Sequence, residues 1–125
     1  MKKVNEFFLD KGNVVTCVNI SKKDKIFCTG DLNKSLKIWR LDNPHPIYSF
    51  SNLTSEISTS LISQCSNFIF GGHQGGSINI FDLNAQKIVR RLNGHKVCCT
   101  CIKEFDKDNI HFLVTGSQDS TVKVI

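Results

Sequence analysis

Three glycine-centred turns recur in this 125-residue chain, and each is followed by a short strand of alternating apolar and polar residues. The glycines are Gly30, Gly72 and Gly116, which lie 42 and 44 residues apart, and the strand keeps one register after each of them. A strand-rich unit repeated at this period cannot bury its apolar faces alone and must stack on its neighbours. The repeat therefore constrains the fold more than the chain length does.

The strands themselves are predicted from alternation between turn signals, because successive side chains of a strand point to opposite faces. No segment of ten or more residues has the apolar spacing of a helix. The predicted fold is all-β, with four antiparallel strands in a complete repeat. The predicted strands cover residues 14–20, 26–29, 35–39 and 47–50, then 57–63, 68–70, 77–81 and 87–92, then 97–102, 112–115 and 121 onward.

The repeat divides the chain into blades of a β-propeller, at residues 13–52, 53–94 and 95–125, and the last blade stops inside its third strand. A closed propeller typically has about 4–8 blades. We therefore expect an N-terminal piece of a longer propeller. Residues 1–12 are a lead-in, in which residues 4–9 stand where a fourth strand would lie and are expected to close a blade that is not present here.

Positive charge is unevenly distributed along the chain, whose net charge is +5. Residues 1–40 carry nine Lys or Arg against four acids, whereas residues 41–86 carry none against three acids. A basic surface can attract acidic partners, but lysines on loops and strand edges also prevent edge-to-edge pairing, which is the interpretation we adopt. We expect no nucleic-acid partner. We also expect no membrane partner, since no apolar run approaches the roughly 18 residues that span a bilayer.

The N-terminus has too short an apolar stretch for a signal peptide. We therefore predict a location in the cytoplasm, where the six cysteines would stay reduced.

The motifs at these turns resemble those of the WD40 repeat family, over essentially the whole chain. The family pattern has Gly-His before the first strand, Gly-Ser-x-Asp between the second and third strands, and Trp-Asp at the end of the third. The third repeat matches best, with Gly94-His95 and with Gly-Ser-Gln-Asp at residues 116–119. The second repeat departs from it, with Asn52-Leu53 in place of Gly-His and Gly75 in place of the aspartate. The resemblance implies a WD40 propeller.

The same resemblance implies a hydrogen-bond network that joins His95, Thr115 and Asp119. A histidine beside an aspartate also occurs in catalytic sites. We interpret these residues as structural, holding a loop to a turn, because buried polar groups are tolerated when they are hydrogen-bonded. The sequence has no phosphate-binding loop, nucleophile elbow or pair of carboxylates. We therefore predict no enzymatic activity and no cofactor.

Cys98 and Cys101 have the spacing of a zinc or redox motif. They fall in a predicted strand, where positions i and i+3 point to opposite faces, and no second ligand pair follows. We interpret them as packing residues and predict no metal site. His45, His73 and His111 have no second ligand at a useful spacing and are expected at the surface or in turns.

A finer resemblance concerns residues 75–96, which are similar to the first propeller of the regulatory subunits of katanin, the microtubule-severing ATPase. It implies a non-catalytic targeting module, a cytoskeletal location at microtubules, centrosome or spindle pole, and microtubules or spindle-pole proteins as partners. It also implies contact with the catalytic ATPase subunit through a C-terminal region that is absent here. The alternative is a WD40 scaffold of another assembly, such as a ubiquitin-ligase receptor or an RNA-processing complex.

Two surfaces are candidates for binding partners. In WD40 propellers the loops between the second and third strands and between successive blades form one face, and on that face the resemblance places Asn33, Lys34, Gln74, Lys96 and Gln118. The opposite face is predicted to collect a denser positive cluster, which we consider the better candidate for acidic tubulin tails. This cluster comprises Lys22, Lys23, Lys25 and Lys107.

Overall fold

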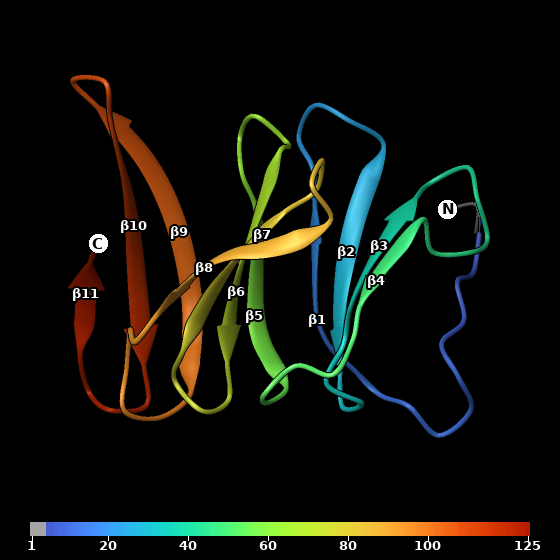
Figure 1. The fold of residues 1–125 in the computed structure, drawn as a ribbon, viewed down its shortest axis with the longest axis horizontal. Coiled ribbons are helices and arrows are strands. Elements are labelled where there is room, and N and C mark those ends of the chain that lie inside the picture. Colours follow the sequence, from blue (N-terminus) through green and yellow to red (C-terminus); the bar gives the residue numbers. More distant parts are fainter. Residues whose placement is uncertain (1–4) are drawn as a thin grey trace.

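The computed structural model describes residues 5–125, which form eleven strands and no helix (Figure 1). Because these residues contain no helix, none of them forms a helical membrane span. The strands are β1 (Val15–Ile20), β2 (Ile26–Asp31), β3 (Leu36–Arg40), β4 (Tyr48–Phe50), β5 (Ile57–Ile62), β6 (Phe68–His73), β7 (Ile78–Asp82), β8 (Lys87–Leu92), β9 (Cys99–Lys107), β10 (Ile110–Ser117) and β11 (Val122–Val124).

The strands make three antiparallel sheets in which each strand pairs with its neighbour in the chain. Blade one contains β1 to β4, blade two contains β5 to β8, and blade three contains β9 to β11. The sheets stand side by side in this order, which confirms the all-β, bladed architecture predicted from the repeat (Figure 1). All eleven strands fall inside the predicted blade ranges 13–52, 53–94 and 95–125.

Apolar side chains fill the space between successive blades. Leu36 and Ile38 of β3 are buried in one apolar cluster with Phe81 of β7, which belongs to blade two. Ile78 of β7 is buried in the same way against blade three. The equivalent side chains of blade three, Val122 and Val124, are instead 74% and 62% exposed. The alternation of each third strand thus produces one buried face per interface, as the period of two requires.

Each blade has a β-bulge at the same place in its first strand. The unpaired residues are Thr16, Ser58 and Thr100, each opposite the junction between the turn glycine and the residue after it. The Thr16 hydroxyl donates to the carbonyl of Ile57 in blade two, and the Ser58 hydroxyl donates to the carbonyl of Cys99 in blade three. The bulges therefore turn a short polar side chain toward the next blade and bond it there.

The described part of the lead-in contacts blade one through its side chains. Val4 lies outside the described residues, and residues 5–9 form no strand. Phe7 instead packs edge-on against Phe27 and Trp39, with ring centroids 5.0 and 5.6 Å apart. Phe27 and Trp39 are paired positions of β2 and β3, so Phe7 lies against the face of blade one.

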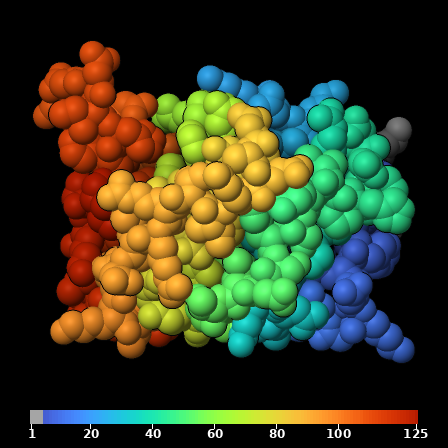
Figure 2. All heavy atoms as spheres, in the orientation of Figure 1, coloured from blue at the N-terminus to red at the C-terminus, as the bar shows by residue number. Residues whose placement is uncertain are grey.

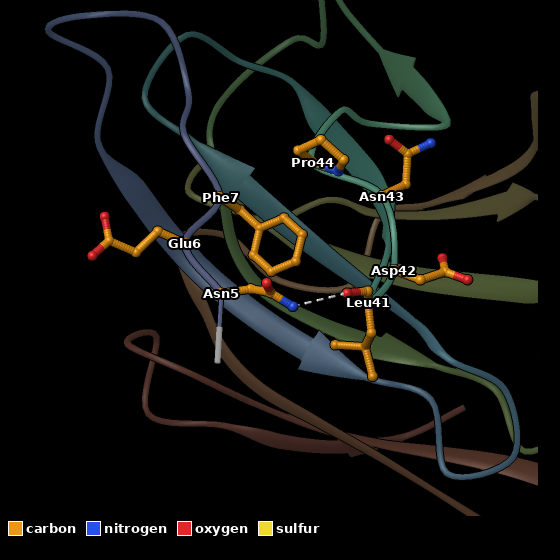
Figure 3. A pocket seen from close by; sticks show the side chains of 7 residues that line it. All are labelled: Asn5, Glu6, Phe7, Leu41, Asp42, Asn43 and Pro44. Carbon is orange, nitrogen blue, oxygen red and sulfur yellow. Dashed lines mark hydrogen bonds between the residues drawn. The ribbon is translucent and has the colours of Figure 1, made fainter. Parts of the chain in front are cut away.

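The contact of Phe7 repeats one made inside the row of blades, where Phe50 of β4 packs against Phe81 at 4.8 Å. Figure 3 shows how the lead-in reaches blade one: the Asn5 side-chain amide donates to the Leu41 carbonyl beside Phe7, along a crevice of about 200 Å³. The lead-in therefore covers the free face of blade one by side-chain contact. Its role as the closing strand of another blade stays a prediction.

Blade three has a longer first hairpin than the other two blades. The predicted strands at 97–102 and 112–115 are too short, because pairing continues out to Lys107 and Ile110. Asp108 and Asn109 both have positive φ, which makes the tight turn that lets the hairpin extend. Figure 2 shows this tip projecting beyond the neighbouring blade. The extra pairs carry stacked Phe105 and Phe112 rings, whose centroids lie 5.0 Å apart.

Candidate interaction surface

One end of the row of blades, which we call the loop face, is formed by turns and inter-blade connections. It comprises the turns at residues 32–35, 74–77 and 118–121 and the connections at residues 51–56 and 93–98. These segments lie at the lower edge of Figure 1. The five residues predicted on one face all fall within these segments; they are Asn33, Lys34, Gln74, Lys96 and Gln118.

Part of the loop face is held together by a chain of contacts around Cys98. Its thiol donates to the Gln74 side-chain oxygen at 3.3 Å, and its carbonyl accepts from the Gln118 backbone amide at 3.1 Å. Lys96 is fixed nearby, since its backbone amide donates to the Asp119 carboxylate at 3.1 Å. The Lys34 carbonyl accepts from Leu53, and Asn33 is exposed in the same turn. The side chains are thus carried on backbone that is bonded in place.

The predicted positive cluster occupies the opposite end of the blades but is divided. Lys22, Lys23 and Lys25 belong to the β1–β2 turn of blade one. Lys107 belongs to the tip of the β9–β10 hairpin, and blade two stands between these two turns (Figure 1). The structure therefore brings three of the four lysines together and leaves the fourth on another blade.

His95 links the connection before blade three to the core and to a turn. Its Nε2 lies 2.8 Å from the Thr115 hydroxyl, and its Nδ1 lies 3.0 Å from an Asp119 oxygen and from the Thr121 hydroxyl. The Thr121 hydroxyl and nearby backbone amides bond the Asp119 carboxylate and hold its pKa well below the ordinary value. The structure brings His95, Thr115 and Asp119 together with the geometry of a loop-to-turn tie. Every polar atom of the histidine ring is used inside the protein.

Blade one fills the equivalent positions differently. Trp39 donates from its indole N–H to the Thr29 hydroxyl at 3.0 Å, and both side chains are buried. Beside them, Asp31 is fully buried. Its carboxylate accepts a hydrogen bond from the Ser35 hydroxyl and forms an ion pair with the Lys37 ammonium at 3.1 Å. Burial raises the pKa of the Asp31 carboxyl, but the bonds from Ser35 and Lys37 outweigh burial and leave that pKa below its ordinary value.

Blade two has an apolar set at these positions. Leu53 stands where His95 stands in blade three, and Gly71 and Phe81 stand where Thr29 and Trp39 stand in blade one. Leu53 and Phe81 are buried. A Cβ on Gly71 would lie 3.0 Å from the Phe81 ring, so the glycine makes room for that ring. No side-chain hydrogen bond is needed here, because the side chains at these three positions have no polar atom.

Beside this apolar set, blade two carries a polar pair that the sequence analysis missed. His73 was expected at the surface or in a turn; it is the last residue of β6, beside the turn, and the expectation of an exposed side chain is wrong, because that side chain is fully buried. Its Nδ1 donates to the Ser55 carbonyl at 3.0 Å, and its Nε2 accepts from the Asn79 amide at 2.9 Å. Burial is the main cause that lowers the pKa of His73. The signal was available, since His73 and Asn79 lie at the same distances from their turn glycine as Asp31 and Lys37.

The cysteines of the CxxC motif lie in different environments. Cys98 precedes β9 and is buried, Cys99 is buried against Gly72, and Cys101 is exposed. Burial raises the pKa of Cys99 to about 11, so its thiol stays protonated at neutral pH. Within residues 5–125 no group of three or more His, Cys, Asp or Glu side chains is placed to hold a metal ion. The thiols of Cys98 and Cys99 are thus packed inside the protein, where Cys98 bonds Gln74.

These repeated positions agree with a known family. The family model described as "WD domain, G-beta repeat" matches residues 2–40 and 86–125. The chain belongs to the WD40 repeat family. The unmatched stretch, residues 41–85, contains Leu53, Gly71 and Phe81, which are the apolar replacements of blade two.

Several curated proteins are similar to this chain. The U3 small nucleolar RNA-associated protein 21 homolog of Schizosaccharomyces pombe is 31% identical over 90% of this chain and 12% of its own length. CCR4-associated factor 4 of Saccharomyces cerevisiae is 26% identical over 82% of this chain and 15% of its own length. The F-box/WD repeat-containing protein sel-10 of Caenorhabditis elegans is 35% identical over 46% of this chain and 9% of its own length. The chain thus spans less than one sixth of each of these relatives.

Solved structures share the fold. The WD40 repeats of RRP9 and the structure of U3-55K each superpose with a TM-score of 0.82 at 17% identity. Each match covers 93% of this chain and 36% or 37% of the solved chain. At this identity the likeness shows the propeller fold alone.

Proposed function

We propose that this chain is a non-catalytic protein-interaction module of a larger assembly, and that a partner protein binds its loop face. The observation that carries the proposal is the loop face itself, where exposed side chains stand on turns whose backbone is bonded in place. The His95–Asp119 pair, which resembles a catalytic pair, uses its polar atoms to tie a connection to a turn. Rigid, exposed loops on a packed scaffold are the usual carriers of recognition.

For the kind of assembly, we favour an RNA-processing complex. Two relatives carry names from that area, the U3 small nucleolar RNA-associated protein 21 homolog and CCR4-associated factor 4. The name of a third relative, an F-box/WD repeat-containing protein, supports a ubiquitin-ligase receptor in the same general role. In either assembly this module is proposed to contact protein rather than nucleic acid.

The katanin interpretation has less support. It depends on the similarity of residues 75–96, and none of the three relatives compared above is a katanin subunit. Its predicted tubulin-binding cluster is also divided between blades one and three. A microtubule or spindle-pole partner and a cytoskeletal location therefore rank below the RNA-processing proposal.

The proposal is tested by purifying the tagged full-length protein with its partners and identifying them by mass spectrometry. Asn33→Arg combined with Gln118→Arg places two bulky charges on the loop face and should remove the main protein partner. Gln64→Arg, at the opposite end of blade two, is the matched control and should retain it. Loss with Gln64→Arg alone would contradict the loop face as the binding surface. Nuclease treatment should leave the interaction intact if the partner is a protein.

The katanin interpretation has a separate test. Co-sedimentation of the full-length protein with microtubules is measured with Lys22, Lys23 and Lys25 all changed to Glu, at low and moderate salt. Attraction between exposed charges is screened over a Debye length of about 8 Å at physiological ionic strength. Salt-sensitive binding that the triple variant loses would support a microtubule partner. Unchanged binding would remove the lysine turn from the mechanism.

A further inference from the structure

We propose that the groove between blades one and two, on the loop face, binds a positively charged side chain, lysine or arginine, of the partner polypeptide. This inference rests on the proposed function, since it names the chemistry that the loop face recognises. It is carried by a difference between two equivalent grooves of the same molecule, one open and acidic and the other closed and neutral.

The groove has a volume of about 480 Å³, and Glu56 is the only ionisable residue that lines it. Glu56 is half-buried, and within residues 5–125 its carboxylate has no hydrogen-bond or ion-pair partner. Its backbone is fixed, because its carbonyl accepts from the Gln74 amide at 2.8 Å. The other lining residues are Thr16, Leu32, Ile57, Ser58 and Gln74.

The walls of the groove suit a long cationic side chain. Leu32 is 49% exposed and offers an apolar surface for the methylene stem of lysine or arginine. The hydroxyls of Thr16 and Ser58 are already bonded to carbonyls of the following blades, so they do not compete for the charged group. A half-buried carboxylate attracts a cation more strongly than an exposed one, because less water screens the pair. The charge-assisted bond would then satisfy the Glu56 carboxylate.

The equivalent groove between blades two and three shows what is special about the first. There Gln74 occupies the place of Leu32, and Cys98 occupies the place of Glu56. Cys98 is only 7% exposed, and its thiol bonds the Gln74 side chain across the groove at 3.3 Å. This second groove is therefore neutral and closed by its own side chains. Of the two grooves on this face, only the first offers an unpaired charge beside an apolar wall.

The charge of the rest of the chain sharpens the contrast. Residues 41–86, which include Glu56, contain no Lys or Arg, in a chain whose net charge is +5. An acidic groove set in a basic protein selects a cationic group locally while the remaining surface repels other parts of a basic partner. Such an arrangement favours one inserted side chain over a broad basic surface.

The test is titration of the full-length protein with short peptides, followed by NMR of the Leu32 methyl groups. The probes are acetyl-Gly-Arg-Gly-amide, acetyl-Gly-Lys-Gly-amide and acetyl-Gly-citrulline-Gly-amide, the last being a neutral analogue of the arginine peptide. We expect the two cationic peptides to shift the Leu32 methyl signals with millimolar affinity and the citrulline peptide to bind at least about tenfold more weakly. Equal binding of arginine and citrulline peptides would overturn the proposal.

Two variants make the test specific. Glu56→Gln keeps the shape and should weaken the arginine peptide about tenfold, whereas Asp24→Asn, at the opposite end of blade one, should leave it unchanged. Leu32→Gln combined with Glu56→Cys copies the closed groove; since this variant has no Leu32 methyl groups, its readout is the side-chain signals of the lining residues Gln74 and Ile57, which the cationic peptides should no longer shift. If Glu56→Gln has no effect on peptide binding while Asn33→Arg with Gln118→Arg still removes the protein partner, the groove proposal fails and the proposed function stands.

Discussion

Blade two and blade three fill the same positions with opposite chemistry. Blade three uses His95 and Thr115, whose hydrogen bonds continue to the turn aspartate. Blade two uses Leu53, Gly71 and Phe81, which pack without any polar atom. Both solutions satisfy the same requirement, that a buried position be filled and leave no donor or acceptor unpaired. The apolar solution depends on shape, whereas the polar solution depends on every member of the network being present.

The difference also affects the neighbouring positions. Where blade two gives up the histidine and threonine, it places a buried His73–Asn79 pair beside the apolar set. Blade one places the Asp31–Lys37 pair, whose carboxylate is buried, at the same positions, whereas the equivalent residues of blade three, Ser117 and Lys123, are not buried. The buried polar pair of blade two is therefore His73 with Asn79, whereas that of blade three is His95 with Thr115, at different positions of the repeat.

The largest effect is expected at Gly76. The fourth residue after each turn glycine has positive φ, at 59° for Lys34, 97° for Gly76 and 69° for Ser120. Only in blade two would a Cβ there lie 2.2 Å from a backbone oxygen, that of His95. Gly76→Ala should lower the free energy of unfolding by about 4 kcal/mol or more, measured by urea denaturation of the full-length protein. Ser120→Gly, the control, should change it by about 1 kcal/mol or less. If Gly76→Ala lowered the free energy of unfolding by no more than about 1 kcal/mol, as expected for Ser120→Gly, the turn would tolerate a side chain at residue 76.

A transplant of blade-one chemistry into blade two comes next. Gly71→Thr should cost about 2–4 kcal/mol, because the new side chain overlaps the Phe81 ring and leaves its hydroxyl unpaired. Adding Phe81→Trp supplies the indole donor that Trp39 provides to Thr29. A double-mutant cycle in urea should then show favourable coupling of at least about 0.5 kcal/mol. Additive losses would mean that the two blades differ in more than these positions.

Removing the polar tie of blade three should have a moderate effect. His95→Ala leaves the Thr115 hydroxyl without its partner, removes one of the bonds to the Asp119 carboxylate, and should lower the free energy of unfolding by about 1–3 kcal/mol. His45→Ala, at an exposed loop histidine, is the control and should stay within about 0.5 kcal/mol. A loss no greater than that of the control would contradict the structural role of His95.

The smallest effect is a dependence on pH that distinguishes the blades. Burial lowers the pKa of His73, so the unfolded chain binds a proton that the folded chain refuses, and stability falls as the pH drops below about 6.5. The lowered pKa values of Asp31 and Asp119 act in the other range, since their contribution is lost only below about pH 4. His73→Gln should flatten the slope between pH 7 and pH 5, and His45→Gln should leave it unchanged. If the pH dependence of the free energy of unfolding were the same in His73→Gln, another group would be its cause.

Much of the fold could be predicted from the sequence because strand alternation and glycine turns are local signals. The period located all three blades and the order of their strands. The length of the blade-three hairpin was not predicted, because Phe105 and Ile110 lie outside the part that is repeated in the other blades. No equivalent residues of those blades indicate where the pairing ends. The closing role of the lead-in stays a prediction, because Asn5 and Phe7 show only its side-chain contacts with blade one.

The site was harder to predict than the fold. The sequence motif identified His95, Thr115 and Asp119, because their spacing is shared with many proteins. It did not identify Glu56 or the Cys98–Gln74 contact, since each depends on which side chain meets which across two blades. His73 was placed at the surface because a lone histidine has no helical or strand signal that reveals burial. Comparing the residues at equivalent positions of the three repeats would have pointed to the His73–Asn79 pair and to the groove that Leu32 and Glu56 line.

The bulge hydroxyls give the row of blades a direction. Thr16 and Ser58 each donate forward along the chain to a carbonyl of the next blade, so the two contacts run in one direction. Each contact joins the donor position of one blade to the acceptor position of the following blade, which is a head-to-tail relation. A series of head-to-tail contacts either closes into a ring or continues without limit.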